Sequence, residues 1–155
     1  MSKSLKRVRA ALNAAGIDTD IIETPLARTA ADAATALGCE IDQIAKSIIF
    51  RGENSGKAIL FITAGGNRVD ADKATALAGE PLGKADATLI RAQTGFAIGG
   101  VSPVGHVNPI TAFVDPRLMD FDVIWAAAGT PHHVFRSNTQ EMLKISGAQP
   151  YDFAS

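Results

Sequence analysis

The sequence predicts an α/β fold in which helices flank a mixed β-sheet. Segments rich in β-branched and aromatic residues alternate irregularly with segments of helical apolar spacing, and this order favours a mixed sheet over a doubly wound parallel one. The chain has 155 residues, of which 46% are hydrophobic, so it has the size and the apolar content of one domain with one continuous core. We therefore predict a single domain over residues 1–155.

Two helices are predicted near the N-terminus. The first is marked by apolar residues at helical spacing, namely Leu5, Val8, Leu12 and Ala15, and Gly16 follows as a residue that ends helices. The second begins at Thr29, whose hydroxyl can cap the first turn, and stops at Gly38. Short helical character is expected to continue through Ile41 and Ile44.

The middle of the chain predicts a hairpin followed by two helices. Residues 47–51 and 57–64 are dominated by β-branched and aromatic side chains, and residues 52–56 between them are typical of a turn. Asp70 is in position to cap a helix that runs to residue 78, and Asp86 is in position to cap another that ends at Gly95.

The last third predicts four strands and a final helix. The strands are expected at residues 96–99, 110–114 and 121–128 and through His133 and Phe135. Residues 100–105 form a loop, and the third strand is almost wholly apolar, so we expect it to be central. Ser137, followed three residues later by Gln140, predicts a capping box at the start of the last helix.

Charge and cysteine content limit the kinds of partner. The formal net charge is −1, with 15 Lys plus Arg against 16 Asp plus Glu, so no overall field attracts the protein to DNA or to nucleic acid of any sequence. A protein that grips only one end of a nucleic acid remains compatible with this charge. Cys39 is the one cysteine, no Cys and His cluster has zinc spacing, and no signal peptide or membrane span is evident. We expect a cytoplasmic protein with no metal, no cofactor and no membrane partner.

The most unusual segment is residues 95–106, where four glycines, a proline and a serine surround one predicted strand end. Glycine lets a ligand approach the backbone closely, and proline restricts the loop so that its N–H groups keep one direction. Such a loop could hold a carbonyl or a ribose. It could equally be a tight turn between two strands, because Gly and Pro are ordinary turn residues.

This loop resembles the GxxxP loop of the YbaK/prolyl-tRNA synthetase-associated editing-domain family, with Gly99 and Pro103 as its fixed ends. Lys46, just ahead of an apolar strand, matches the lysine of that family, and residues 29–38 resemble its Thr-capped, Ala-rich helix. The resemblance extends over about residues 4–147. It implies a strongly curved mixed sheet flanked by helices.

The resemblance also implies an activity. Members of this family hydrolyse the aminoacyl ester at the 3′ end of mischarged tRNA, which suggests a deacylase that acts in trans on a small amino acid of the Ala, Cys, Ser or Thr class. An ester next to a ribose hydroxyl needs a held water, an oriented substrate and stabilised charge. The alternatives are a non-catalytic module that binds aminoacyl-tRNA or a synthetase, and a hydrolase of small esters or amides. A synthetase partner would supply the tRNA affinity that the near-neutral charge does not.

The resemblance assigns roles to residues of the predicted site. Lys46 would orient the terminal nucleotide, and Gly99 and Gly100 would present main-chain donors to the reacting ester. The substrate-binding residues would be Thr29, Val101, Ser102, Pro103, Gly129 and His132. Without the resemblance, the pattern around Lys46 favours a solvated lysine at a strand edge, because most lysines are exposed.

Three histidines remain open in their roles. His132 and His133 are adjacent at a strand start, so their rings must point to opposite faces and at most one faces a pocket. In the family, a late histidine helps to select the amino acid, and we assign this role to His132. His106 could contact the ribose or serve as a polar turn residue.

A serine and a basic stretch are two further candidates for a functional role. Ser102 is not expected to act as a nucleophile, because Pro103 directly after it lacks the N–H that an oxyanion hole requires. The basic residues near the N-terminus are Lys3, Lys6, Arg7 and Arg9. They could touch the tRNA acceptor stem or simply form the solvated face of a helix.

Overall fold

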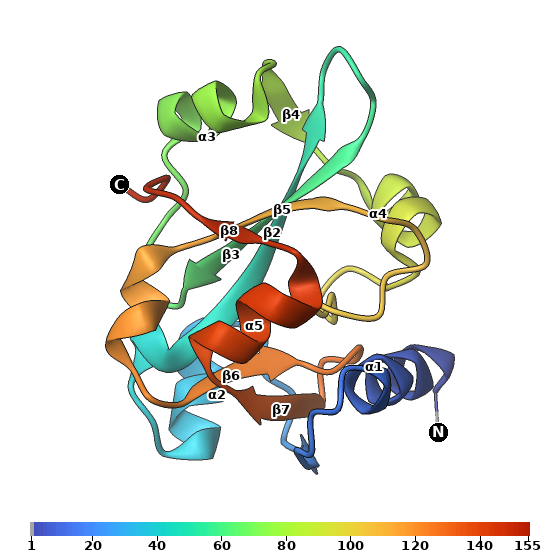
Figure 1. Cartoon of the computed structure of the whole chain (residues 1–155), viewed down its shortest axis with the longest axis vertical. Helices are drawn as coiled ribbons and strands as arrows, with labels where there is room; N and C mark the ends of the chain where they lie inside the picture. Colours follow the sequence, from blue (N-terminus) through green and yellow to red (C-terminus); the bar gives the residue numbers. More distant parts are fainter. Residues whose placement is uncertain (1) are drawn as a thin grey trace.

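The computed structural model describes residues 2–155, which form one eight-stranded sheet with helices packed against it (Figure 1). In spatial order the strands are β1 (Ile21–Glu23), β7 (His133–Ser137), β6 (Ile124–Ala127), β2 (Ile44–Gly52), β3 (Ala58–Ala64), β5 (Thr111–Val114) and β8 (Gln149–Pro150), while β4 (Leu82–Lys84) pairs with β2. β2 is antiparallel to β3 and parallel to β6. The predicted mixed sheet flanked by helices is therefore confirmed.

The five α-helices are α1 (Lys3–Ala14), α2 (Ala30–Leu37), α3 (Ala71–Ala78), α4 (Ala87–Thr94) and α5 (Thr139–Ser146), and two 3-10 helices are η1 (Ile41–Gln43) and η2 (Pro116–Asp120). Thr29, Asp70 and Asp86 cap α2, α3 and α4 by accepting hydrogen bonds from backbone amides of the first turn. The first four helices are confirmed, because caps and apolar spacing are local signals.

The sheet is buried on both faces along β3. Alternate residues of this strand point to opposite sides, so Leu60 and Ile62 join a main core with α1, α4 and α5, whereas Phe61 joins a second cluster with Phe113 and Phe153. All seven residues of β3 are buried. The β2–β3 hairpin is thus the centre of the molecule and supplies the rigid frame for its neighbours.

Two strand predictions differ from the structure. Residues 96–99 form a turn, not a strand, because Gly99 takes a positive φ of 92° and the Gly100 amide donates to the Ala97 carbonyl at 3.1 Å. The strand predicted at 121–128 is shortened to β6. The Phe121 amide closes η2 by donating to the Leu118 carbonyl at 3.4 Å, and the Val123 carbonyl accepts from the Gln43 side chain at 3.0 Å instead of from a strand. β6 does lie inside the sheet, between β7 and β2.

Two helix boundaries were also wrong. Ser137 is the last residue of β7, and Asn138 caps α5 by accepting from the Glu141 amide at 2.9 Å. The sequence has two possible capping pairs one residue apart, Ser137 with Gln140 and Asn138 with Glu141. Because β7 extends to Ser137, the helix starts from the second pair. Ile44 begins β2 instead of continuing helical structure, since it pairs with Trp125 of β6.

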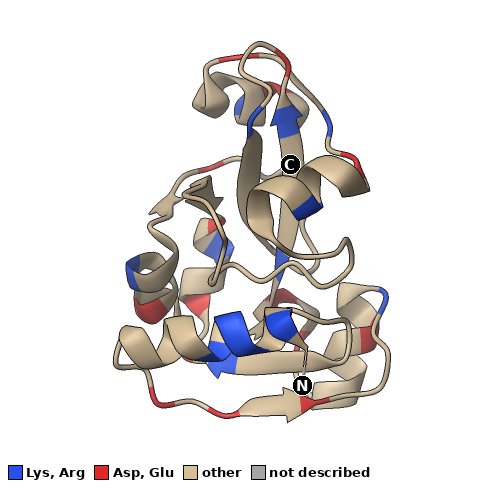
Figure 2. Ribbon diagram, turned by 90° about the vertical axis from the view of Figure 1, so that its right-hand side faces the viewer, with Lys and Arg blue, Asp and Glu red and all other residues tan. Residues whose placement is uncertain are grey.

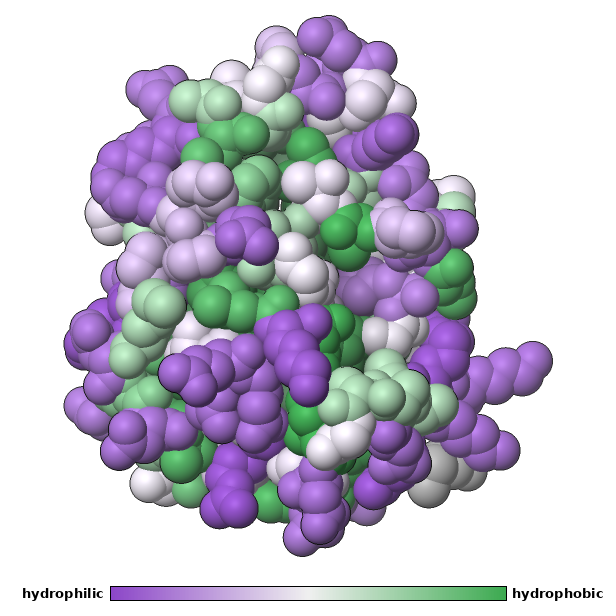
Figure 3. All heavy atoms as spheres, viewed as in Figure 1, coloured by the Kyte–Doolittle hydropathy of each residue, from purple (hydrophilic) through white to green (hydrophobic). Residues whose placement is uncertain are grey.

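The surface of the molecule is mixed in character. Hydrophilic and hydrophobic side chains are interspersed over the face drawn in Figure 3, as is usual for water-exposed protein surface. Charges of both signs are spread over the chain, although α1 carries basic residues and no acidic ones (Figure 2). No helix within residues 2–155 has both the length and the apolar character to cross a membrane.

Candidate functional site

A cleft of about 640 Å³ opens along one edge of β2, and we call it the β2 cleft. It is lined by Arg28, Thr29 and further residues at the start of α2, by residues 46–49 of β2, by Ile98, Gly99 and Val101, and by Thr130, Pro131 and His133. This volume is in the range of sites for small organic ligands. The cleft therefore joins four segments that are distant in the sequence.

The cleft exists because β2 lacks a neighbour over part of its length. On one side β2 pairs with β3 from Ala45 to Arg51. On the other side β6 pairs only with Ile44 and Ala45, and β4 only with residues 50–52. Among the described residues, no strand is in register with residues 46–49 on that side. The sheet is open there, and the opening forms the floor of the cleft.

Lys46 lies in this opening. It is half-buried, and its ammonium group donates a hydrogen bond to the Gly65 carbonyl at 3.2 Å. Burial, and then the nearby Arg68 guanidinium, lower the pKa of Lys46, while Asp42 and Asp115 partly oppose them. The side chain thus places a compact, partly desolvated cation beside an apolar cleft.

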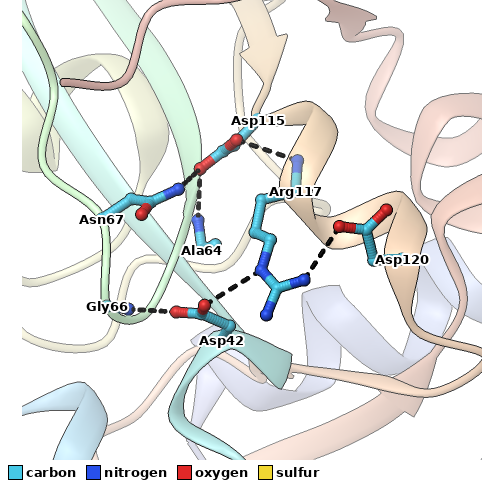
Figure 4. Close-up of polar contacts among 7 residues, drawn as sticks. All are labelled: Asp42, Ala64, Gly66, Asn67, Asp115, Arg117 and Asp120. Atoms are coloured by element: carbon cyan, nitrogen blue, oxygen red, sulfur yellow. Dashed lines mark hydrogen bonds and ion pairs between the residues drawn. The ribbon is translucent and has the colours of Figure 1, made fainter.

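The turn at residues 64–67, which supplies the Gly65 carbonyl, is fixed by two carboxylates (Figure 4). The buried Asp115 accepts from the backbone amide of the first turn residue at 3.1 Å and from the side-chain amide of the last at 2.9 Å. Asp42 accepts from the Gly66 amide at 2.8 Å and pairs with Arg117 at 3.0 Å. The acceptor for the lysine is therefore held in place.

The predicted loop is held from outside by Arg7 of α1. Its guanidinium donates to the Gly95 carbonyl at 2.6 Å and to the Gly105 carbonyl at 3.2 Å, and it lies 5.0 Å from the centre of the Phe96 ring. One side chain thus joins both ends of residues 95–105. The sequence suggested that the basic residues of this helix touch the tRNA acceptor stem or form a solvated face. Arg7 instead braces the loop through its hydrogen bonds.

Arg7→Ala is expected to destabilise the protein by about 2 kcal/mol, because two hydrogen bonds to a charged group and the contact with Phe96 are lost. Thermal unfolding measures this effect. Lys6→Ala is the matched control, since Lys6 is exposed on the same helix turn, and its melting temperature should equal that of the wild type. Equal melting temperatures for both variants would contradict the bracing role.

The structure divides the predicted loop residues into two groups. Gly99 and Val101 line the β2 cleft, as does Thr29. Ser102 and Pro103 are buried and do not line it, and the Ser102 hydroxyl accepts from the Val104 amide at 3.3 Å. The buried pair supports the loop from behind.

Gly100 and Gly129 lie where backbones meet. A Cβ on Gly100 would be 2.8 Å from the Thr130 Cα, and a Cβ on Gly129 would be 2.9 Å from the Ser4 carbonyl group. The first contact joins the two loops that flank the cleft, and the second joins one of them to α1. Neither residue lines the cleft itself.

The three histidines lie in different environments. His132 is exposed and does not line the cleft, whereas His133 does, with its Nδ1 2.7 Å from the Thr130 hydroxyl. His106 lies behind the loop with Nε2 2.7 Å from the Ser102 carbonyl, and burial lowers its pKa. Of the three, His133 is the one placed to meet a ligand in the cleft.

Sequence reasoning missed the open edge of β2 and the Gly65 carbonyl. The strand prediction began at Ser47 and gave no sign that residues 46–49 would lack a partner on one side, because strand pairing is not local. The Gly65-Gly66 pair after a buried strand was the available signal. A Cβ on Gly65 would lie 2.1 Å from the Ile41 carbonyl, so that position requires glycine.

Comparisons with known proteins point to one family. Residues 24–145 match a family model described as aminoacyl-tRNA editing domain. The uncharacterized protein YwhH of Bacillus subtilis (strain 168) is 29% identical over 144 residues, which are 92% of this chain and 91% of that protein. The solved structure of a candidate trans-editing enzyme for prolyl tRNA synthetase is 45% identical, with a TM-score of 0.92 over 100% of this chain and 99% of that one. Hypothetical protein APE2540 is 26% identical, with a TM-score of 0.87 over 96% and 99%.

Proposed function

The chain belongs to the aminoacyl-tRNA editing domain family, the YbaK/prolyl-tRNA synthetase-associated family, and on that premise we propose that it is a trans-acting deacylase of mischarged tRNA. The ester that it cleaves would join tRNA to a small amino acid of the Ala, Cys, Ser or Thr class. The observation that carries this proposal is the shared cleft: Lys46 and Gly99 line one cavity at the open edge of β2.

The proposed ester hydrolysis requires few catalytic side chains. Water attacks the ester carbonyl, the bond between that carbon and the ribose oxygen breaks, and the proton from water ends on the ribose. The main-chain amides of Gly99 and Val101, which line the cleft, would stabilise the negative charge that develops on the carbonyl oxygen. Lys46 would hold the terminal nucleotide, and the neighbouring ribose hydroxyl of the substrate would assist the proton transfer.

The walls of the cleft are largely apolar and include many small side chains. Several alanines line it, namely Ala27, Ala30, Ala31, Ala33, Ala45, Ala85, Ala126 and Ala127. Apolar walls of this kind select by size, at about 1–3 kcal/mol for each methylene group. Such walls suit an amino acid without a charged side chain, and the small size that we propose for it rests on the family resemblance.

The tRNA would be gripped at its acceptor end. With a net charge of −1, the chain can neutralise few phosphates, so tight binding along the RNA is not expected. Arg28 and Lys46 line the cleft, and these two cations would meet the terminal nucleotides. A synthetase bound to the same tRNA would raise the local concentration of substrate.

One observation supports a second candidate function. Among the described residues that line the cleft there is no Asp or Glu, so the usual carboxylate base of a hydrolase is not at hand. A module that binds aminoacyl-tRNA without turnover would need no such base.

A panel of tRNAs charged with Ala, Cys, Ser, Thr and Pro separates these functions. Release of labelled amino acid from one or more mischarged tRNAs is the expected result. Saturable binding with no loss of ester would instead favour the binding module. Equal hydrolysis of free aminoacyl esters would favour a small-molecule hydrolase and refute the tRNA-directed activity.

His133→Ala is expected to lower kcat/KM on the best substrate about tenfold or to change the preferred amino acid, because His133 lines the cleft. His132→Ala is its control and should stay within about twofold of the wild type, since His132 is exposed outside the cleft. Kinetics on the tRNA panel measure both. The reverse pattern would restore the selecting role to His132.

A further inference from the structure

Ser47 lies in the middle of the open section of β2, and its hydroxyl oxygen is buried without a hydrogen-bond partner among the described residues. Ser47 is also one of the residues that line the β2 cleft. A buried hydroxyl that is left unpaired destabilises a protein and is rare in native structures. The position of this one suggests that its partner is a ligand.

The main chain of Ser47 faces the same way. The Gly52 amide donates to the Lys57 carbonyl of the hairpin at 2.9 Å, whereas the Glu53 amide donates to the Pro81 carbonyl, on the β4 side, at 2.8 Å. Because main-chain groups alternate along an antiparallel strand, even-numbered residues of β2 bond to β3 and odd-numbered residues face the other edge. The N–H and carbonyl of Ser47 therefore point toward the β2 cleft.

The charged residues at the cleft limit which groups could bind the amino end of the substrate. An aminoacyl ester carries an α-ammonium group, which needs hydrogen-bond acceptors. No carboxylate is present among the described residues that line the cleft, so carbonyl and hydroxyl oxygens must serve. The Gly65 carbonyl is already taken by Lys46, and consecutive residues of a strand point to opposite faces. An ammonium group beside the Ser47 hydroxyl would thus lie on the other face of β2 from Lys46.

We propose that Ser47 binds the α-amino group of the substrate, with its main-chain carbonyl and its hydroxyl each accepting one N–H. The aminoacyl group would then pair with the open edge of β2 as a short added strand does. This inference rests on the proposed deacylase function and names the part of the cleft that recognises the amino acid. Ser47 would be a binding residue that separates amino esters from other esters.

Ser47→Ala tests the proposal with two substrates. One is the aminoacyl-tRNA that the panel identifies as best, and the other is the matching α-hydroxyacyl-tRNA, in which a hydroxyl replaces the amino group. The variant should lower kcat/KM about tenfold on the amino ester and less than about twofold on the hydroxy ester. Its melting temperature should equal or exceed that of the wild type, because an unpaired buried hydroxyl is removed.

The outcomes are distinct. Equal losses on the two esters, or no loss on either, would show that Ser47 does not read the amino group. A wild-type protein that cleaves the two esters equally well would overturn the subsite while leaving the deacylase function in place. A wild-type protein that cleaves no aminoacyl-tRNA would overturn both proposals.

Discussion

Lys46→Ala is expected to slow deacylation of the best mischarged tRNA at least about 100-fold, because the terminal nucleotide would lose the cation that holds it, and a displacement of about 1 Å at the reacting ester can cost that much. The cation lies in the opening of β2 and is held there by the Gly65 carbonyl. Because the side chain is half-buried and makes this one hydrogen bond, its removal should leave the fold intact. Single-turnover rates and circular dichroism measure the two effects.

Lys144→Ala is the matched control for this variant. Lys144 is exposed on α5 and does not line the cleft, so the control should deacylate at the wild-type rate. A wild-type rate in Lys46→Ala itself would remove this lysine from the mechanism. A lost circular dichroism spectrum would instead show that its role is structural.

Gly100→Ala is expected to reduce deacylation between about 10-fold and 100-fold, because the new methyl group would meet the Thr130 backbone at 2.8 Å. Backbone atoms cannot turn aside as a side chain can, so the two loops beside the cleft must separate. A displacement of about 1 Å in a reacting group can lower a rate 100-fold. The overpacking should also destabilise the protein by about 1–3 kcal/mol, which thermal unfolding measures.

Gly79→Ala separates the loss of geometry from the loss of stability. Gly79 ends α3 with a φ of 75°, and a Cβ there would have no atom within 4 Å. Alanine in this conformation costs about 1 kcal/mol, in a segment that does not line the cleft. The Gly79→Ala variant should unfold at a lower temperature than the wild type but deacylate tRNA at the wild-type rate. Equal rates for both glycine variants would argue against loop contact as a determinant of activity.

The sequence was most informative where a signal is local. Thr29, Asp70 and Asp86 predicted the starts of three helices because a cap acts within one turn. The hairpin of β2 and β3 was equally clear, since turn residues separate two apolar runs. These elements set the class of fold, and the resemblance to the editing family indicated the activity that we propose.

The candidate site was less accessible because it depends on pairing between distant segments. β1, β4 and β8 are two or three residues long and carry too few residues to show a period. The side from which β6 and β4 approach β2, and the gap between them, follow from packing of the whole chain. The choice between His132 and His133 depends on the same register, which fixes Ala127 opposite Val134.

The contacts of α1 determine how far the chain can be shortened from its N-terminus without loss of support for the cleft. The stretch that matches the family model starts at residue 24, beyond α1, yet Arg7 braces one loop and the Ser4 backbone abuts Gly129 in the other. A fragment trimmed to residues 24–145 would keep every residue that lines the cleft. It would lose the contacts of α1 that support the two loops beside the cleft. The family-model match therefore begins inside the structural unit, and any fusion or transplant of this chain must carry its first helix.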